Sequence, residues 1–194
     1  MTKKLNLPKR IEDSFEDSIR VISESKNLIP SIQKSVNMIV DCFSHGGKII
    51  TIGNGGSAAD SQHLAAELIG RFKLKRKSLP AISLTTDTSI ITALGNDYGF
   101  EVIFSRQCES LVQKNDVVII FSTSGKSKNI IKAVNVSKNK GAKIIAFIGE
   151  NINPLKKNSD IILNVPSKST SHIQEVHRIL MHIICELVEE KFIE

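Results

Sequence analysis

Five short, almost continuously apolar runs constrain the fold of this chain more than any other feature. They begin after residue 47, and longer stretches with helical periodicity separate them. The runs are residues 49–52, 81–84, 117–121, 144–148 and 161–165. Strands that are apolar on both faces and alternate with helices are typical of a parallel sheet between two helical layers. The pattern therefore predicts a doubly wound α/β fold with a five-stranded parallel sheet flanked by helices.

Amphipathic helices are predicted at both ends of the chain. The apolar stripes comprise Ile11, Phe15, Ile19 and Ile22, then Ile32, Val36, Ile39 and Phe43, and finally Ile173, Val176, Leu180, Ile183 and Leu187. Pro30 suits the start of the second helix, and Gly46 with Gly47 suits its end. The N-terminal stripes could cover their own sheet, another subunit, or both. We predict a single domain over residues 1–194, in which 1–47 are helices used in packing and oligomerisation and 48–194 form the α/β core.

Composition narrows the class of protein. Hydrophobic residues make up 41% and charged residues 24%, as in ordinary soluble domains. No apolar stretch approaches the 18 residues of a membrane span, and the first residues lack the apolar region of a secretory signal. Three scattered cysteines indicate buried thiols in a reducing compartment. We therefore expect a cytoplasmic protein without a membrane partner.

The formal net charge of +6 raises the question of nucleic acid binding. The densest basic run is residues 71–77, with sequence RFKLKRK. Aromatic residues are only 5% of the chain and Trp is absent, so a stacking platform for single strands is not indicated. We interpret the run as a solvated basic loop, with attraction of a small anion as the alternative, and expect no nucleic acid partner.

A glycine-rich segment, GNGGSAAD at residues 53–60, follows the first predicted strand. Glycines allow backbone amides to approach an anion closely, and the N-terminus of the next helix adds a positive dipole end. This makes Asn54, Gly55, Gly56 and Ser57 candidate ligand-binding residues. A dinucleotide-binding loop and a plain turn capped by Ser57 remain alternatives.

A hydroxyl-rich segment, STSGKS at residues 122–127, follows the third predicted strand. Its hydroxyls belong to Ser122, Thr123, Ser124 and Ser127. The spacing of an ATP-binding P-loop is absent. A second set of phosphate donors at the carboxyl end of a strand favours a phosphosugar over a dinucleotide, with helix capping as the simpler explanation.

Two helices carry groups suited to proton transfer or metal binding. His63 and Glu67 are four residues apart and share one face of a helix, where they could bind a metal or form an exposed pair. Gln174 and His182 are eight residues apart, about 80° around the last helix, and could reach one site. His177 points elsewhere and is predicted to be structural.

The chain resembles the SIS (sugar isomerase) domain and, more narrowly, the bacterial phosphoheptose isomerases. The matching segments occur in family order and span almost the full length. They are residues 53–68, 84–89, 95–101, 122–125 and 173–177. The resemblance implies conversion of sedoheptulose 7-phosphate to D-glycero-D-manno-heptose 7-phosphate through an enediol, the first step of ADP- or GDP-heptose biosynthesis. An aldose–ketose isomerase needs a base for carbon and an acid–base partner for oxygen.

The same resemblance assigns roles to individual residues. It implies Glu67 and His182 as the catalytic pair and one zinc ion per subunit bound by His63, Glu67, Gln174 and His182. The implied substrate-binding residues are Asn54, Gly55, Gly56, Ser57, Glu67, Asn96, Asp97, Ser122, Thr123, Ser124, Ser127 and Gln174. It also implies a homotetramer with active sites at subunit interfaces, where His182 could meet Glu67 across chains. By themselves, Asn96 and Asp97 indicate a turn, and they could equally supply side-chain acceptors for sugar hydroxyls.

Two other functions are compatible with parts of the sequence. A non-catalytic SIS-domain protein that binds the DNA replication initiator would not need Glu67, Gln174 and His182 together, so their joint presence favours the enzyme. A nicotinamide-dependent oxidoreductase would need an acidic residue about 20 positions after the glycine loop. Asp87 is about 30 positions on, which disfavours that function.

Overall fold

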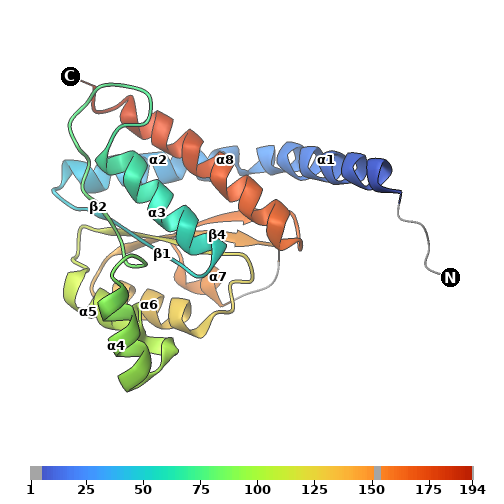
Figure 1. Ribbon diagram of the computed structural model, residues 1–194. Helices are drawn as coiled ribbons and strands as arrows, with labels where there is room; N and C mark the ends of the chain where they lie inside the picture. Colours follow the sequence, from blue (N-terminus) through green and yellow to red (C-terminus); the bar gives the residue numbers. More distant parts are fainter. Residues whose placement is uncertain (1–5, 151–153, 194) are drawn as a thin grey trace.

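The computed structural model describes residues 6–150 and 154–193, so both ends of the predicted 1–194 domain lie outside the described residues. Its elements alternate between strand and helix after two N-terminal helices, as predicted (Figure 1). In chain order they are α1 (Leu7–Glu24), η1 (Ser25–Leu28), α2 (Ile29–Ser44), β1 (Ile49–Gly53), α3 (Gly56–Ile69), β2 (Ala81–Ser83), α4 (Thr88–Tyr98), η2 (Phe100–Val102), α5 (Ser105–Leu111), β3 (Val117–Ser122), α6 (Lys128–Asn139), β4 (Lys143–Gly149), α7 (Leu155–Asn158), β5 (Ile161–Val165) and α8 (Thr170–Glu189).

The five strands form one sheet in the order β2-β1-β3-β4-β5, and every neighbouring pair is parallel. This confirms the doubly wound, five-stranded sheet. The strand order reverses between β1 and β3, which pair from Ile49 with Val117 to Gly53 with Phe121. In open α/β sheets ligands bind outside the carboxyl ends of the strands at such a switch point. The loops after β1 and β3 are therefore the place to look for a site.

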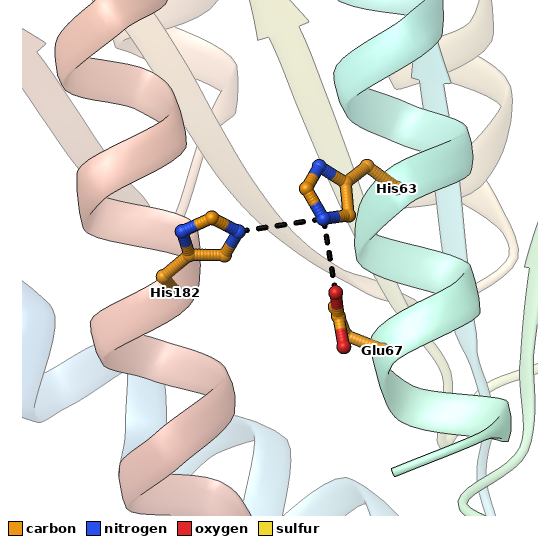
Figure 2. Close-up of side chains that lie close together, drawn as sticks. All are labelled: His63, Glu67 and His182. Carbon is orange, nitrogen blue, oxygen red and sulfur yellow. Dashed lines mark hydrogen bonds and ion pairs between the residues drawn. The ribbon is translucent and has the colours of Figure 1, made fainter. Parts of the chain in front are cut away.

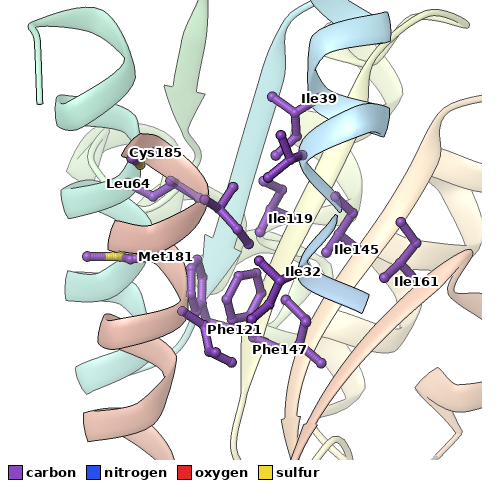
Figure 3. Close-up of a cluster of buried hydrophobic side chains, with 14 of the residues drawn as sticks. Ile32, Ile39, Leu64, Ile119, Phe121, Ile145, Phe147, Ile161, Met181 and Cys185 are labelled. Atoms are coloured by element: carbon purple, nitrogen blue, oxygen red, sulfur yellow. The ribbon is translucent and has the colours of Figure 1, made fainter. Parts of the chain in front are cut away.

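Side chains of the central strands alternate between two cores. On β3 and β4, Ile119, Phe121, Ile145 and Phe147 face α2, α3 and α8 (Figure 3). Their neighbours in the chain, such as Ile120, join the second core with residues of α5 and α6. Both faces of these strands are buried, which explains why the runs are apolar without alternation. Each fully buried side chain of this kind contributes about 1.5–3 kcal/mol.

The two N-terminal helices have different environments. Ile32, Val36 and Ile39 of α2 are buried against the sheet. In contrast, α1 extends beyond the sheet (Figure 1), and Phe15 and Ile19 on its apolar stripe are 67% and 64% exposed. The two predicted stripes therefore differ. The stripe of α2 covers the sheet of its own chain, whereas most of the α1 stripe has no partner within the described residues.

One part of the predicted stripe on α8 is wrong. Ile183 and Leu187 are each 37% exposed, whereas Ile184 and Val188 are buried. The predicted spacing averages 3.5 residues per turn, and a straight helix of 3.6 residues per turn drifts away from such a stripe by about 20° every seven residues. The buried face consequently shifts by one position in the second half of the helix.

The three cysteines are free and buried, as predicted. Burial raises the pKa of Cys42 and of Cys108 to about 11, and that of Cys185 to about 12. These thiols therefore stay protonated at neutral pH and are chemically inert. None of the helices in residues 6–150 and 154–193 is long and apolar enough to cross a membrane.

Candidate functional site

A cavity of about 260 Å³ lies at the switch point of the sheet. The loop after β1, the loop after β3 and the start of α8 contribute its walls. The lining residues are Asn54, Gly56, Ser57, Phe121, Ser122, Thr123, Ser124, Ser127, Thr170 and Gln174. The two polar segments predicted from the sequence therefore form one site, together with Gln174.

Glycines in the first loop are required by close contacts. A Cβ atom on Gly53 would lie 2.3 Å from the carbonyl oxygen of Ser57, and one on Gly56 would lie 2.6 Å from Nε2 of Gln174. Gly55 has a φ of 56°, in the region that favours glycine. Ser57 itself is a buried residue inside α3 and Gly55 is the N-cap, so the alternative of a turn capped by Ser57 is wrong.

Three helices begin at this cavity. Gly56 and Thr170 are the first residues of α3 and α8, and Ser127 is the N-cap of α6. Ser127 makes no side-chain capping bond, so its hydroxyl is available to a ligand and capping does not account for it. Helix N-termini present free N–H groups and positive dipole ends to an anion. The cavity is thus suited to a phosphate group.

Hydrogen bonds shape the loop after β3. Oγ of Ser122 accepts from the backbone N–H of Gly125 at 3.1 Å, and Oγ of Ser124 accepts from that of Lys126 at 3.3 Å. Gly125 has a φ of 64°. These two bonds within the loop bend its backbone, so that the segment curves around the cavity.

Asn54 is held by a residue that the sequence analysis missed. Its side-chain amide and that of Asn129 exchange two hydrogen bonds, of 3.0 and 2.9 Å. Asn129 is buried and also accepts from the N–H of Ile130. A buried amide at the start of α6 has no separate sequence signal, because its partner lies 75 residues away.

Figure 2 shows a second group of side chains, His63 and Glu67 from α3 and His182 from α8. Nε2 of His63 lies 2.9 Å from Oε1 of Glu67 and 3.4 Å from Nε2 of His182. All three side chains are half-buried. The structure therefore brings together the predicted catalytic pair and His63 within one chain, so the expectation that His182 meets Glu67 across chains is not needed.

His182 favours its neutral form. Burial, followed by the neighbouring His63, lowers its pKa below the ordinary value of 6.5. A neutral imidazole at neutral pH can accept a proton or bind a metal. His177 is different: it is fully buried and its ring meets those of Phe121 and Phe147 edge-on, which confirms that it is structural.

The donor atoms of this group fit a zinc ion. One ligand atom from each of His63, Glu67 and His182 lies within 4.8 Å of the other two. Two imidazole nitrogens and one carboxylate oxygen form a typical catalytic zinc set, which keeps one position open. Gln174 lines the neighbouring cavity and packs against Gly56. Its place as a fourth ligand stays a prediction.

The structure does not bring Asn96 and Asp97 to the cavity of their own chain. Both are exposed on the helix α4, so the turn predicted for them is wrong, and Nδ2 of Asn96 donates to Oδ1 of Asp97 at 2.8 Å. In Figure 1, α4 lies on the opposite side of the sheet from α3 and α8. Their role in substrate binding stays a prediction that requires a neighbouring subunit.

The sequence analysis also missed the environments of two arginines, Arg178 and Arg76. Nη2 of Arg178 pairs with Oδ1 of the buried Asp60 at 3.0 Å, which joins α8 to α3. Arg76, part of the run interpreted as a solvated loop, has a side chain only 1% exposed, so that interpretation is wrong at this residue. Charge density alone does not reveal burial, because the ion-pair partner of Arg76, Glu189, lies more than a hundred residues away in the chain.

Comparisons with known proteins show the family of this chain. The SIS domain family matches residues 13–149. A phosphoheptose isomerase of Citrifermentans bemidjiense is 50% identical over 84% of this chain and 85% of its own. The solved structure of a phosphoheptose isomerase from Neisseria gonorrhoeae matches with a TM-score of 0.90 and 39% identity, over 95% of this chain. That of a phosphoheptose isomerase from Francisella tularensis matches with a TM-score of 0.92 and 36% identity, over 96% of this chain. Both matches cover the full length of the solved chain. The chain therefore belongs to the SIS domain family and, within it, to the phosphoheptose isomerases, which are sugar-phosphate isomerases.

Proposed function

We propose that this enzyme converts sedoheptulose 7-phosphate to D-glycero-D-manno-heptose 7-phosphate, the first step of ADP- or GDP-heptose biosynthesis. The observation that carries the proposal is the pairing of an anion-binding cavity with an acid–base group on the same two helices. Ser57 and His63 are six residues apart on α3, roughly 9 Å of helix rise. An extended ketose phosphate can therefore hold its phosphate in the cavity and its carbonyl end at His63, Glu67 and His182.

The phosphate would be held by hydroxyls and helix N-termini at the switch point. The proposed contacts are with Ser57, Ser122, Thr123, Ser124 and Ser127. Asn54, Gly55, Gly56 and Gln174 would border the sugar, and the Asn129 amide keeps Asn54 in place. This arrangement fixes the carbon chain before any proton moves, which accounts for a large part of catalysis in such reactions.

The reaction itself is a transfer of protons. In the proposed mechanism, the carboxylate of Glu67 removes a proton from C1 of the ketose and an enediol forms as O2 gains a proton. The proton then returns to C2 while O1 loses its own, which leaves the aldose. Neutral His182 moves the proton between the two oxygens. General acid–base groups of this kind contribute about 10²–10⁴-fold to rates.

Zinc is proposed as the cofactor, one ion per subunit, held by His63, Glu67 and His182 with Gln174 as the fourth ligand. The ion would polarise the sugar oxygens when bound. Glu67 has two carboxylate oxygens, and Oε1 faces His63. An atom bound to the ion cannot take up a proton at the same time, so Glu67 and His182 would each alternate between holding the ion and moving a proton.

We also propose a cytoplasmic homotetramer with active sites at subunit interfaces. The exposed stripe of α1 supports assembly, as does an apolar groove between α2 and α8 that includes Ile29, Ile183 and Leu187. An adjacent subunit would supply Asn96 and Asp97, which are exposed in the single chain. Buried free thiols are compatible with a reducing cytosol.

The decisive experiment is an isomerase assay of the purified protein with five-, six- and seven-carbon ketose phosphates. We expect turnover of sedoheptulose 7-phosphate in preference to the shorter ketoses, because the phosphate and acid–base groups are fixed at one separation. Preference for a five- or six-carbon ketose would overturn the substrate assignment. No turnover with zinc supplied, together with binding of a replication initiator, would support the non-catalytic alternative.

A further inference from the structure

The ring of Phe72 lies against the imidazole of His182. Their ring centroids are 5.3 Å apart and the ring planes differ by 24°, so the two are stacked. His63 meets the same imidazole edge-on, with centroids 4.9 Å apart and an angle of 75°. His182 is therefore confined by a flat apolar face from one neighbour and a ring edge from another.

The segment that carries Phe72 is attached to the end of α8 through Glu189. One carboxylate of this buried residue accepts three backbone N–H groups, from Phe72 at 2.8 Å, Lys73 at 2.7 Å and Leu74 at 2.6 Å. Burial alone would raise the pKa of Glu189, but these three amides and Arg76 lower it overall. Glu189 is therefore ionised, and it fixes the backbone of Phe72 directly.

Arg76 extends this attachment to α3. Its Nε lies 3.3 Å from Oε2 of Glu189, and both side chains are 1% exposed. Nη2 donates to the carbonyl oxygen of Glu67 at 2.8 Å, and Nη1 donates to that of Leu68 at 2.9 Å. A cation at these carbonyls compensates the negative end of α3. One ion pair thus joins the helix of Glu67, the helix of His182 and the Phe72 segment.

From these contacts we infer that Phe72 is a positioning residue for His182, held in place by the Arg76–Glu189 pair. The inference rests on the proposed role of His182 in the isomerase reaction. A flat ring limits rotation of the imidazole, and it offers no competing hydrogen bond that would draw Nε2 away from His63. Phe72 does not line the cavity proposed to bind phosphate, so its effect is on the orientation of His182 rather than on substrate binding.

The test compares Phe72→Leu, which keeps an apolar side chain but removes the flat face, with the conservative Phe72→Tyr. A matched control is Phe192→Leu, because Phe192 forms an edge-on pair with Phe43 at 5.7 Å and is not stacked on His182. We expect kcat of Phe72→Leu to fall about tenfold to a hundredfold, with KM unchanged. Phe72→Tyr and Phe192→Leu should retain the kcat of the wild type. A loss confined to KM, or an equal loss in Phe192→Leu, would overturn the inference.

A crystal structure of each variant gives a readout that does not depend on activity. In Phe72→Leu we expect the His182 ring to rotate or to occupy more than one orientation, whereas in Phe192→Leu it should keep that of the wild type. An unchanged, single orientation in Phe72→Leu would overturn the inference even if the enzyme is active. If the wild type turns over no ketose phosphate but the ring is disordered in Phe72→Leu, the proposed function fails and the positioning role stands.

Discussion

The Nε2 atoms of His63 and His182 face each other at 3.4 Å, although 119 residues separate them in the chain. This contact is one of a series between α3 and α8. Gly56 packs against Gln174 at the cavity, and Asp60 pairs with Arg178 one turn further along. The two helices therefore run side by side from the cavity proposed to bind phosphate to the group proposed to transfer protons.

The acid–base roles predict severe losses of rate in Glu67→Gln and His182→Gln. Each change removes a proton-transfer group but preserves the size of the side chain or its polarity. We expect kcat to fall by about 10²–10⁴-fold while the melting temperature stays close to that of the wild type. Glu109→Gln and His45→Gln, at exposed positions away from the site, serve as controls. Full activity in either site variant would refute the mechanism.

The metal proposal predicts different effects for His63→Ala and Gln174→Ala. Removing an imidazole ligand should abolish most zinc binding, measured as metal content after exposure to a chelator. Removing a neutral amide should weaken zinc less, because an amide is not a usual zinc ligand. Since Gln174 lines the cavity, its loss should raise KM. A wild-type enzyme that stays active without metal would exclude zinc from the reaction.

The buried Arg76–Glu189 pair predicts a large loss of stability in Glu189→Ala. Without the carboxylate, three backbone amides and a guanidinium lose their partner in a site that is 1% exposed. Breaking a buried pair costs about 3–5 kcal/mol of unfolding free energy, measurable by urea denaturation. Glu186→Ala on the same helix breaks the half-exposed pair with Lys73 and should cost only about 0–1 kcal/mol. Equal costs would contradict the structure.

His177 predicts a loss of stability in acid. Burial lowers its pKa from 6.5 to about 4, so the folded protein keeps it neutral while the unfolded chain takes up a proton. Above about pH 6.5, His177 makes no pH-dependent contribution to the unfolding free energy. As the pH falls from there towards 4, protonation of His177 in the unfolded chain lowers the unfolding free energy by roughly 3 kcal/mol in total. Unfolding free energies of wild type and His177→Phe between pH 4 and 7.5 test this. The variant should show a shallower decline, and identical slopes would show that His177 does not titrate this way.

The exposed stripe of α1 predicts that assembly depends on this helix. Phe15→Glu places a charge in the middle of the stripe, where the side chain is 67% exposed in the single chain. Sedimentation velocity should show a smaller assembly than that of the wild type. Glu16→Ala, an exposed change next to the stripe, should leave assembly unchanged. A monomeric wild type would remove the basis for the proposal.

Much of the fold followed from local patterns. All five strands lie where the apolar runs predicted them. The central strands β1, β3 and β4 are buried on both faces, so their apolar runs needed no information from a partner, whereas the edge strand β2 leaves Ile82 38% exposed. The glycines at residues 53, 55 and 56 were also readable, since close contacts and a positive φ leave little choice of residue. The C-terminal helix α8 was predicted, but not all of its buried face, because a shift of one position in a helical stripe depends on what packs against it.

Contacts between distant segments could not be predicted from the sequence in the same way. The amide pair of Asn54 and Asn129 and the burial of Arg76 depend on partners that come from other elements. The stacking of Phe72 on His182 likewise joins a loop to a helix more than a hundred residues later. Such contacts carry no periodic signal, so only the packed structure reveals them.

The sequence by itself determined the parallel sheet, the glycine-rich and hydroxyl-rich loops at the strand ends, and the residue types available for proton transfer. These follow from burial, backbone freedom and helical spacing within short segments. Only the tertiary structure decided that His63, Glu67 and His182 meet within one chain, that α1 leaves its stripe exposed, and that Asn96 and Asp97 lie away from the cavity. The reason is physical: the relative placement of α3, α4 and α8 is set by how they pack on the two faces of the sheet, which no local pattern encodes.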